Sequence, residues 1–476
     1  MYKYYISAVS CAAILFGFSD ISYAQTTKQN VEELVNYACE THPTITSANL
    51  SVQQAGTRIS EAKSLFLPTI NSVSEVSIAD DQLDEGLGVS GTRPYSTQLI
   101  VDQPIYNGGR ARNEVKSARL FQEGLRFEGI SQVIDIQSSI VTAYISLSFT
   151  LADLRVRREN LDFLRNEKND AERRYALGGG TISNIVEVES RISRAEGDFV
   201  AAQARVNQAR IALGVATGIA VGEDVDDIVH SKPILSYEDA LADTLERNPQ
   251  IKSAEQQIHI AETTVERVRA DRRPQINLIG DLNMQRETSF SGFERDEARV
   301  RLRLDIPIFA GGRLAAQEKG AIIDVTRTEI DKAAVTRNVV EQIQLQWDRV
   351  HETRNLISVN SELVVASQKA LNAIKKEVFE GFRPGRDVLD AQQELLEAQL
   401  RLEQSRFIFT QASFDLQFAT GDVDAERFPK CGEAIREIIA INPRQRGDRY
   451  QIDLPIIGDV IGSEEGRRRR GAPNRR

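Results

Sequence analysis

A short segment that occurs twice constrains the fold more than any other feature of the sequence. Residues 103–110 read QPIYNGGR and residues 306–313 read IPIFAGGR, so the copies lie 203 positions apart (307 − 104). In each copy a run of alternating residues reaches a proline, which predicts the end of a strand because proline has no N–H for the ladder. The glycine pair permits a sharp change of direction before a long helical pattern. The flanking segments match as well, so the sequence predicts two copies of one structural unit.

Composition and the N-terminus narrow the class of protein. Hydrophobic residues make up 41% of the 476 residues, slightly below the ~45–50% usual for globular chains, which suits long solvent-exposed helices. The net charge of −10 argues against a nucleic-acid partner. Residues 1–24 combine Lys3, a short apolar run and Ser22-Tyr23-Ala24, which is the pattern of a secretory signal peptide. A membrane anchor is disfavoured because the apolar run is too short to span a bilayer.

Cys39 and Cys431 are the two cysteines that follow the predicted signal peptide. An exported chain meets an oxidising compartment, in which a disulfide between them would persist. The sequence leaves this disulfide and a pair of free thiols open as alternatives.

The two predicted units cover residues 25–218 and 237–421, and residues 219–236 link them. In each unit a helical segment leads to a β-hairpin, a very long helix, a glycine-containing turn and a return helix. The predicted ranges are 69–105 and 275–308 for the hairpins, 110–176 and 313–379 for the long helices, 176–184 and 379–387 for the turns, and 184–214 and 386–419 for the return helices. Apolar residues recur every seven positions in the long helices, which is typical of coiled-coil packing.

The last segment, residues 422–476, loses this periodicity and ends in Arg467–Arg470, Arg475 and Arg476. Such a charge block predicts a largely disordered tail. A basic tail that binds a membrane or a partner is the alternative.

The predicted strands alternate apolar and polar residues. In the second return strand Val300, Leu302 and Leu304 alternate with arginines at 299, 301 and 303. This alternation over about ten residues is typical of a membrane barrel wall with lipid outside and water inside; an ordinary half-buried hairpin is the alternative. We therefore expect Arg299, Arg301 and Arg303 to line a barrel lumen. Open strand edges are not tolerated in lipid, so four strands per chain require several chains, and three chains would supply twelve.

Signs of catalysis are missing from the sequence. The four histidines (His42, His230, His259 and His351) show no metal-ligand spacing, and no nucleophile elbow, phosphate loop or dinucleotide fingerprint is present. The sequence therefore predicts that the protein is no enzyme and has no cofactor or metal. Asp387 and Asp390 are three positions apart after the second turn and so share a helix face. Acids in a first turn also complement the helix dipole, which is the simpler account of the pair.

Together these features resemble the TolC-type outer-membrane efflux proteins. The resemblance rests on the repeat, on Leu67-Pro68 after the opening helix, on the Pro-Ile-aromatic-x-Gly-Gly-Arg junction and on residues 387–392, which read DVLDAQ; it covers residues from about 30 to 425. It implies a mainly α fold with a small β part: a long coiled-coil α-helical barrel in the periplasm that continues into a trimeric twelve-stranded β-barrel in the outer membrane of a Gram-negative bacterium. It also implies a passive exit duct that docks an inner-membrane transporter of the RND, ABC or MFS class through a periplasmic adaptor protein.

The resemblance also suggests roles for individual residues. Asp387 and Asp390 would ring the periplasmic entrance, and Arg383, with Arg386 close by, would help to latch it. A tyrosine that the family has three residues before the turn glycine is Val378 here. The ends of the long helices, at Leu177, Gly178, Glu380 and Gly381, are the predicted docking tips for the adaptor.

Two classes of function follow from the sequence. The first is a homotrimeric outer-membrane duct that exports drugs, small toxic molecules or secreted proteins. The second is an exported structural coiled-coil protein or adhesin that forms no channel. The sequence does not distinguish drug efflux from type I protein secretion.

Overall fold

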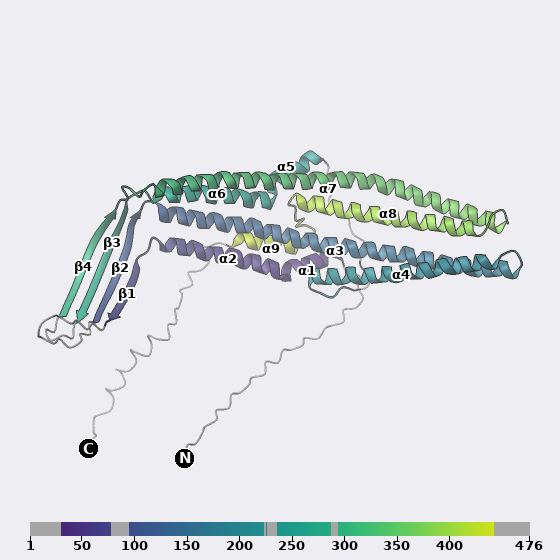
Figure 1. The fold of residues 1–476 in the computed structure, drawn as a ribbon, viewed down its shortest axis with the longest axis horizontal. Helices are drawn as coiled ribbons and strands as arrows, with labels where there is room; N and C mark the ends of the chain where they lie inside the picture. The colour runs from purple at the N-terminus through teal and green to yellow at the C-terminus, as the bar shows by residue number, and fades with distance from the viewer. Residues whose placement is uncertain (1–29, 78–94, 223–224, 226–235, 287–293, 442–476) are drawn as a thin grey trace, which may run out of the picture.

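The computed structural model describes residues 30–77, 95–222, 225, 236–286 and 294–441. The predicted signal peptide, both hairpin loops, most of the linker and the arginine-rich end lie outside these residues. The same order of elements occurs twice (Figure 1). The first half contains α1 (Val31–Thr41), α2 (Pro43–Ser64), β1 (Thr69–Val76), β2 (Tyr95–Asn107), α3 (Arg110–Ala176) and α4 (Ile182–Thr217). The second contains α5 (Tyr237–Arg247), α6 (Pro249–Ala270), β3 (Gln275–Arg286), β4 (Glu294–Asp305), α7 (Arg313–Phe379) and α8 (Arg386–Ala419), and α9 (Pro429–Ala440) follows.

The helices α3 and α7 set the length of the molecule. Each has 67 residues, which corresponds to about 100 Å. They run from the sheet to the opposite end of the molecule, where they turn back as α4 and α8 (Figure 1). The turn from β2 into α3 requires glycine at position 108. Its φ is +65°, and a Cβ there would lie 2.5 Å from the carbonyl oxygen of Ala270.

The four strands form one antiparallel sheet in the order β1-β2-β3-β4, so β1 and β4 are its edges. The prediction that a strand ends at the repeated proline is wrong for the first copy. Strand β2 continues through Pro104 to Asn107, and its register with β3 shifts between Pro104 and Tyr106. An irregularity of this kind accommodates a residue that cannot donate to the ladder. In the second copy β4 ends at Asp305, before Pro307.

The main apolar core lies where α1, α3 and α9 meet. Val35, Tyr144, Phe428 and Ile438 are fully buried there. The prediction of a largely disordered tail is therefore wrong for residues 429–440, which form α9 between α2 and α3 (Figure 1). The helix begins at Pro429, a favourable first helical residue, and is stabilised by partners almost 400 positions earlier in the chain.

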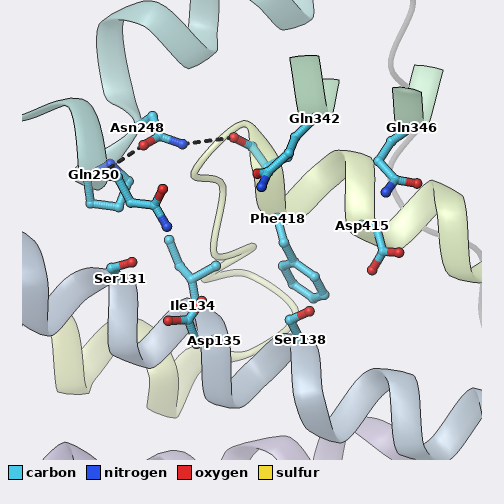
Figure 2. A pocket seen from close by; sticks show the side chains of 12 residues that line it. Ser131, Ile134, Asp135, Ser138, Asn248, Gln250, Gln342, Gln346, Asp415 and Phe418 are labelled. Atoms are coloured by element: carbon cyan, nitrogen blue, oxygen red, sulfur yellow. Dashed lines mark hydrogen bonds between the residues drawn. The ribbon is translucent and has the colours of Figure 1, made fainter. Parts of the chain in front are cut away.

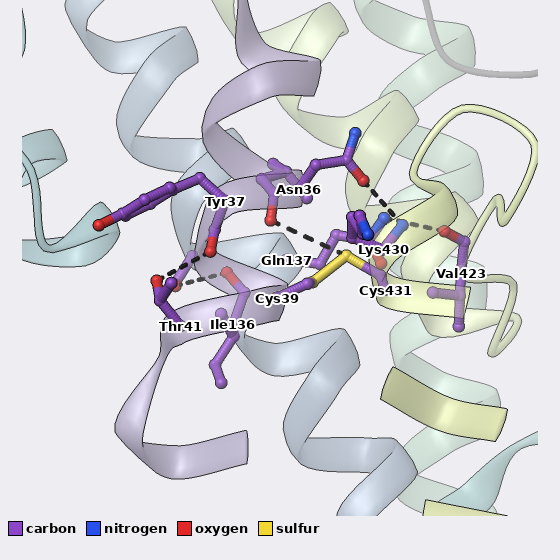
Figure 3. Close-up of a disulfide and its surroundings, with 11 residues drawn as sticks. Asn36, Tyr37, Cys39, Thr41, Ile136, Gln137, Val423, Lys430 and Cys431 are labelled. Atoms are coloured by element: carbon purple, nitrogen blue, oxygen red, sulfur yellow. Dashed lines mark hydrogen bonds between the residues drawn. A yellow bond between two sulfur atoms is a disulfide. The ribbon is translucent and has the colours of Figure 1, made fainter. Parts of the chain in front are cut away.

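A disulfide between Cys39 and Cys431 joins α1 to α9, with 5.0 Å between the two Cα atoms (Figure 3). This is one of the two alternatives that the sequence left open. The backbone N–H of Lys430 also donates to the side-chain oxygen of Asn36 (3.0 Å). The N-terminal and C-terminal parts of the described chain are thus fixed to each other.

Among the described helices, α3 contains a stretch that is long and apolar enough, by composition, to cross a membrane. The same helix supplies core residues, because Ile140, Tyr144 and Leu147 are buried against α1, α4 and α9. Packing in this core accounts for part of the apolar composition of α3.

Candidate functional site

The turn between α3 and α4 and the turn between α7 and α8 lie together at the end of the molecule opposite the sheet (Figure 1). Gly178 and Gly381 have φ values of +74° and +84°. A Cβ at either position would meet no atom within 4 Å. Glycine is therefore favoured by the backbone conformation and not by crowding, and a large side chain there would project into the surroundings of the tip.

Large apolar side chains are exposed at both turns. Leu177 is 87% exposed at the first turn, and Phe379 and Phe382 are 90% and 78% exposed at the second. Exposed apolar groups that gather at one place mark a surface for contact with another protein. Leu177, Gly178, Glu380 and Gly381 were predicted for this end, whereas Phe382 was not singled out. Its signal in the sequence was an aromatic residue next to the turn glycine.

The helices α3 and α4 form a first helical hairpin, and α7 and α8 form a second. Arg383 makes its contacts within the second helical hairpin. Its Nε lies 2.6 Å from Glu377 Oε2, and its Nη1 lies 3.5 Å from Asp387 Oδ2. Arg386 is exposed, and the described residues include no ion pair of its guanidinium. Within one chain, neither arginine connects the second helical hairpin to the first.

Asp390 is held from the first half of the chain. The Nη2 of Arg191, on α4, lies 2.6 Å from Asp390 Oδ1, and the Nη1 of Arg191 donates to the carbonyl oxygen of Leu389 (3.2 Å). Glu187 lies one turn earlier on α4 and 3.5 Å from the same guanidinium. Sequence reasoning missed Arg191 because it lies 199 positions from Asp390. A Glu-Arg pair four residues apart near the first tip was the only local signal.

The contact between α8 and the first helical hairpin also includes buried residues. Gln392 Nε2 donates to Asn160 Oδ1 on α3 (3.0 Å), and this hydrogen bond is buried. Leu389 packs in an apolar cluster with Leu161, Leu164, Val188 and Ala195. The two helical hairpins of one chain are therefore in firm contact near the tips.

The sheet has one apolar and one mainly polar face. Residues directly opposite in neighbouring strands share a face, and Leu302 is paired with Leu278, whereas Arg303 is paired with Asn277. Arg299, Arg301 and Arg303 lie on the polar face, each next to a carboxylate. Arg301 Nη2 is 2.9 Å from Asp281 Oδ1, Arg303 Nε is 2.9 Å from Asp305 Oδ2, and Arg299 pairs with Glu297. This face is therefore charge-balanced in the structure, although the arginines alone suggested a basic one.

A polar cleft lies midway along the helices, between α3, the start of α6, α7 and the end of α8 (Figure 2). Its cavity of about 270 Å³ is lined by Asp135, Asp415, Gln342 and Gln346, among others. Burial raises the pKa of the Asp135 carboxyl. Burial also raises the pKa of Asp415 to about 6, an effect that the nearby charge of Arg349 opposes. In the part of the chain that the structure describes, no three His, Cys, Asp or Glu side chains are arranged to hold a metal.

The family model described as outer membrane efflux protein matches residues 34–219 and 240–422, one segment in each half. The chain belongs to this outer membrane efflux protein family. The family prediction from the sequence is confirmed, and with it the outer-membrane location and the channel class. The alternative of an exported coiled-coil protein without a channel does not fit the family.

Relatives and solved structures agree with this assignment. The alkaline protease secretion protein AprF of Pseudomonas aeruginosa is 22% identical over 397 residues, which are 80% of this chain and 80% of the relative. The outer membrane protein TolC of Escherichia coli is 20% identical over 450 residues, or 90% and 89% of the two chains. The solved structure of CusC superposes with a TM-score of 0.74 at 20% identity and covers 84% of this chain and 95% of that one. The mainly helical fold with one four-stranded sheet is thereby confirmed.

Proposed function

We propose that this outer membrane efflux protein works as a homotrimeric exit duct. The observation that supports the trimer most strongly is the sheet: it has four strands, an apolar face exposed at Val300, Leu302 and Leu304, and two edge strands, β1 and β4. Unpaired strand edges are not tolerated in lipid. Pairing β4 of one copy with β1 of the next closes a barrel of twelve strands. Arg299, Arg301 and Arg303 then face its lumen.

The tips of the helices are the proposed contact with the periplasmic adaptor protein. They lie farthest from the sheet, at about 100 Å by helix length, and carry the exposed side chains Leu177, Phe379 and Phe382. Through the adaptor the duct would serve an inner-membrane transporter of the RND, ABC or MFS class. The transporter, not the duct, would select drugs, small toxic molecules or secreted proteins as cargo.

Asp387 and Asp390 are the proposed ring of acids at the periplasmic entrance. Threefold symmetry would bring six carboxylates to one opening. Arg383 lies against Asp387 and would restrict the opening at rest, with Arg386 on the same turn adding positive charge.

Two measurements on the purified full-length protein and its gene test this function. In planar bilayers we expect discrete ion-conducting pores. Deletion of the gene should increase sensitivity to toxic small molecules or remove a protein from the culture medium, and the intact gene should restore the lost export. A protein that yields no pores, and whose deletion changes neither export property, would contradict the proposal.

A further inference from the structure

We propose that a groove between α2 and α9 is the docking site of the chain's own C-terminal segment, residues 442–476. The groove has a volume of about 430 Å³, and it is lined by residues from the end of α1, from α2 and from α9. The inference does not depend on the proposed duct, because it concerns a contact within one chain.

Part of the groove is apolar and held in a fixed shape. Ile45 and Ala434 are buried among its lining residues, whereas Leu50 is 57% exposed. A large exposed apolar side chain beside a cavity marks a place that another apolar group can cover. The disulfide from Cys39 to Cys431 ties α9 to α1 at this point (Figure 3). The two sides of the groove are therefore positioned before anything binds, which lowers the cost of binding.

The polar side chains of the groove favour a cation that donates hydrogen bonds. The carboxylates of Glu40, Glu433 and Glu437 line it, against the single ammonium group of Lys430. Lys430 is paired with Glu433 (3.1 Å), and neither Glu40 nor Glu437 has an ion pair with a described residue. The side-chain oxygen of Asn49 is buried and accepts no hydrogen bond within the described part of the chain. A guanidinium would supply both the positive charge and the N–H donors.

The C-terminal segment has the complementary composition. Residues 442–476 contain nine arginines and five acidic residues, a net charge of +4 (9 − 5), in a chain whose net charge is −10. Residues 454–461 read LPIIGDVI, and this apolar run lies between the arginines at 444, 446 and 449 and the block Arg467–Arg470. An apolar run with arginines on both sides suits a groove that combines apolar residues with carboxylates.

The segment also begins beside the groove. Helix α9 has 12 residues and is about 18 Å long, and the carbonyl oxygen of Ile441 at its end accepts a hydrogen bond from Arg126 Nη2 (2.6 Å). Residues 442–453 span up to about 40 Å when extended, so the apolar run reaches any part of the groove in the same chain. A partner protein or a second copy would compete with a segment that is tethered next to the site at a high effective concentration.

Limited trypsin digestion of the purified full-length protein in detergent tests the contact, because trypsin cleaves after arginine. The rate of cleavage at Arg467–Arg470, followed by mass spectrometry, should rise several-fold in the double variant Glu40→Gln with Glu437→Gln, and also in Leu50→Asn. The matched control is Glu352→Gln with Glu362→Gln, at exposed positions of α7, which should leave the rate unchanged. Equal rates in the wild type and in both groove variants would overturn the inference.

A photoreactive benzoylphenylalanine in place of Leu50 identifies the occupant of the groove. We expect a crosslink to residues 442–476 of the same chain, whereas the same group in place of Val359, an exposed residue of α7, should give none. A crosslink to a second copy, which doubles the mass on a denaturing gel, a crosslink to another protein, or no crosslink at all would overturn the inference. Protection of the arginines from trypsin only after vesicles with anionic lipid are added would assign the segment to a membrane surface and overturn it as well.

Discussion

At the scale of single residues, the two acids that we propose for the entrance have different surroundings although they lie three positions apart. Asp387 contacts an arginine of its own turn, whereas Asp390 contacts Arg191 from the other half of the chain. The sequence pointed to both acids by their spacing on one helix face, and the resemblance to the family suggested their role. Nothing in the sequence indicated that Arg191 contacts Asp390, since only the fold brings α4 and α8 together.

The entrance acids should control ion selectivity. The double variant Asp387→Ala with Asp390→Ala removes six carboxylates from a trimer, so its permeability ratio for cations over anions should fall, with little change in trimer stability. Exposed charges are screened over about 8–10 Å at ordinary salt, so the difference should be largest at low ionic strength. Reversal potentials across a salt gradient measure the ratio. Wild-type selectivity in the double variant at low salt would favour a role in helix capping alone.

Asp415 should make the stability of the protein depend on pH. Burial raises the pKa of its carboxyl from 3.8 to about 6, so the folded state binds the proton more tightly than the unfolded state. Ionisation of the buried carboxyl lowers the free energy of unfolding. This loss is absent below pH 3.8, grows as the pH rises and is complete above about pH 6, where it amounts to at most about 3 kcal/mol.

Asp415→Asn should therefore raise the apparent Tm at pH 7.5 and leave it nearly unchanged at pH 4. Thermal unfolding followed by circular dichroism at several pH values measures both. The control is Asp348→Asn, at an exposed position of α7, which should shift neither. A variant that is equally stabilised at pH 4 and pH 7.5 would show that ionisation of Asp415 is not the cause.

At the scale of elements, the sequence predicts best where local signals mark both ends. The helices α3 and α7 begin at Gly-Gly-Arg and end before a turn glycine, and their observed bounds, 110–176 and 313–379, are the predicted ones. Helix α9 was missed although its 12 residues have an apolar face, with Cys431, Ala434 and Ile438 buried. It is short and follows a turn near the arginine-rich end, and its packing partners come from α1 and α3, far away in the sequence. The passage of β2 through Pro104 was missed because a bulge depends on the register of the neighbouring strand.

Strand β4 should tolerate charge on one face only. Leu302 is exposed on the apolar face, opposite Leu278, and Leu302→Arg should cost about 2–4 kcal/mol per chain near mid-bilayer. The amount of folded protein in outer-membrane fractions measures this. The matched change on the polar face is Arg301→Leu, and this variant should yield more folded protein than Leu302→Arg. Normal assembly of Leu302→Arg together with failure of Arg301→Leu would reverse the assignment of the two faces.

The turn between α7 and α8 should be needed for docking but not for assembly. Gly381→Trp places a large side chain where only open space surrounds the glycine, and it strains a φ of +84°. Export and crosslinking to the adaptor should be lost, while the amount of trimer stays at the wild-type level. Gly197→Trp is a control away from the tip, at a position of α4 with no atom near the added Cβ. Normal crosslinking and export in Gly381→Trp would show that this turn is no docking site.

At the scale of the whole molecule, the described chain is incomplete as a membrane protein by itself. Its sheet exposes two edges and an apolar face, while its helices extend far beyond any depth that a bilayer could cover. Both features are explained if three copies close one barrel in the outer membrane and one hollow helical bundle in the periplasm. The membrane part then fixes the position of the channel, and the long helices carry its entrance to the adaptor and the transporter.

The most direct test of this account is an image of the particle extracted from the outer membrane, obtained by electron cryomicroscopy. We expect three copies around one axis, a closed barrel with β1 of each copy paired to β4 of its neighbour, and a continuous lumen that narrows at Asp387 and Asp390. A particle with a single chain, or with strands that do not close around a lumen, would contradict the account.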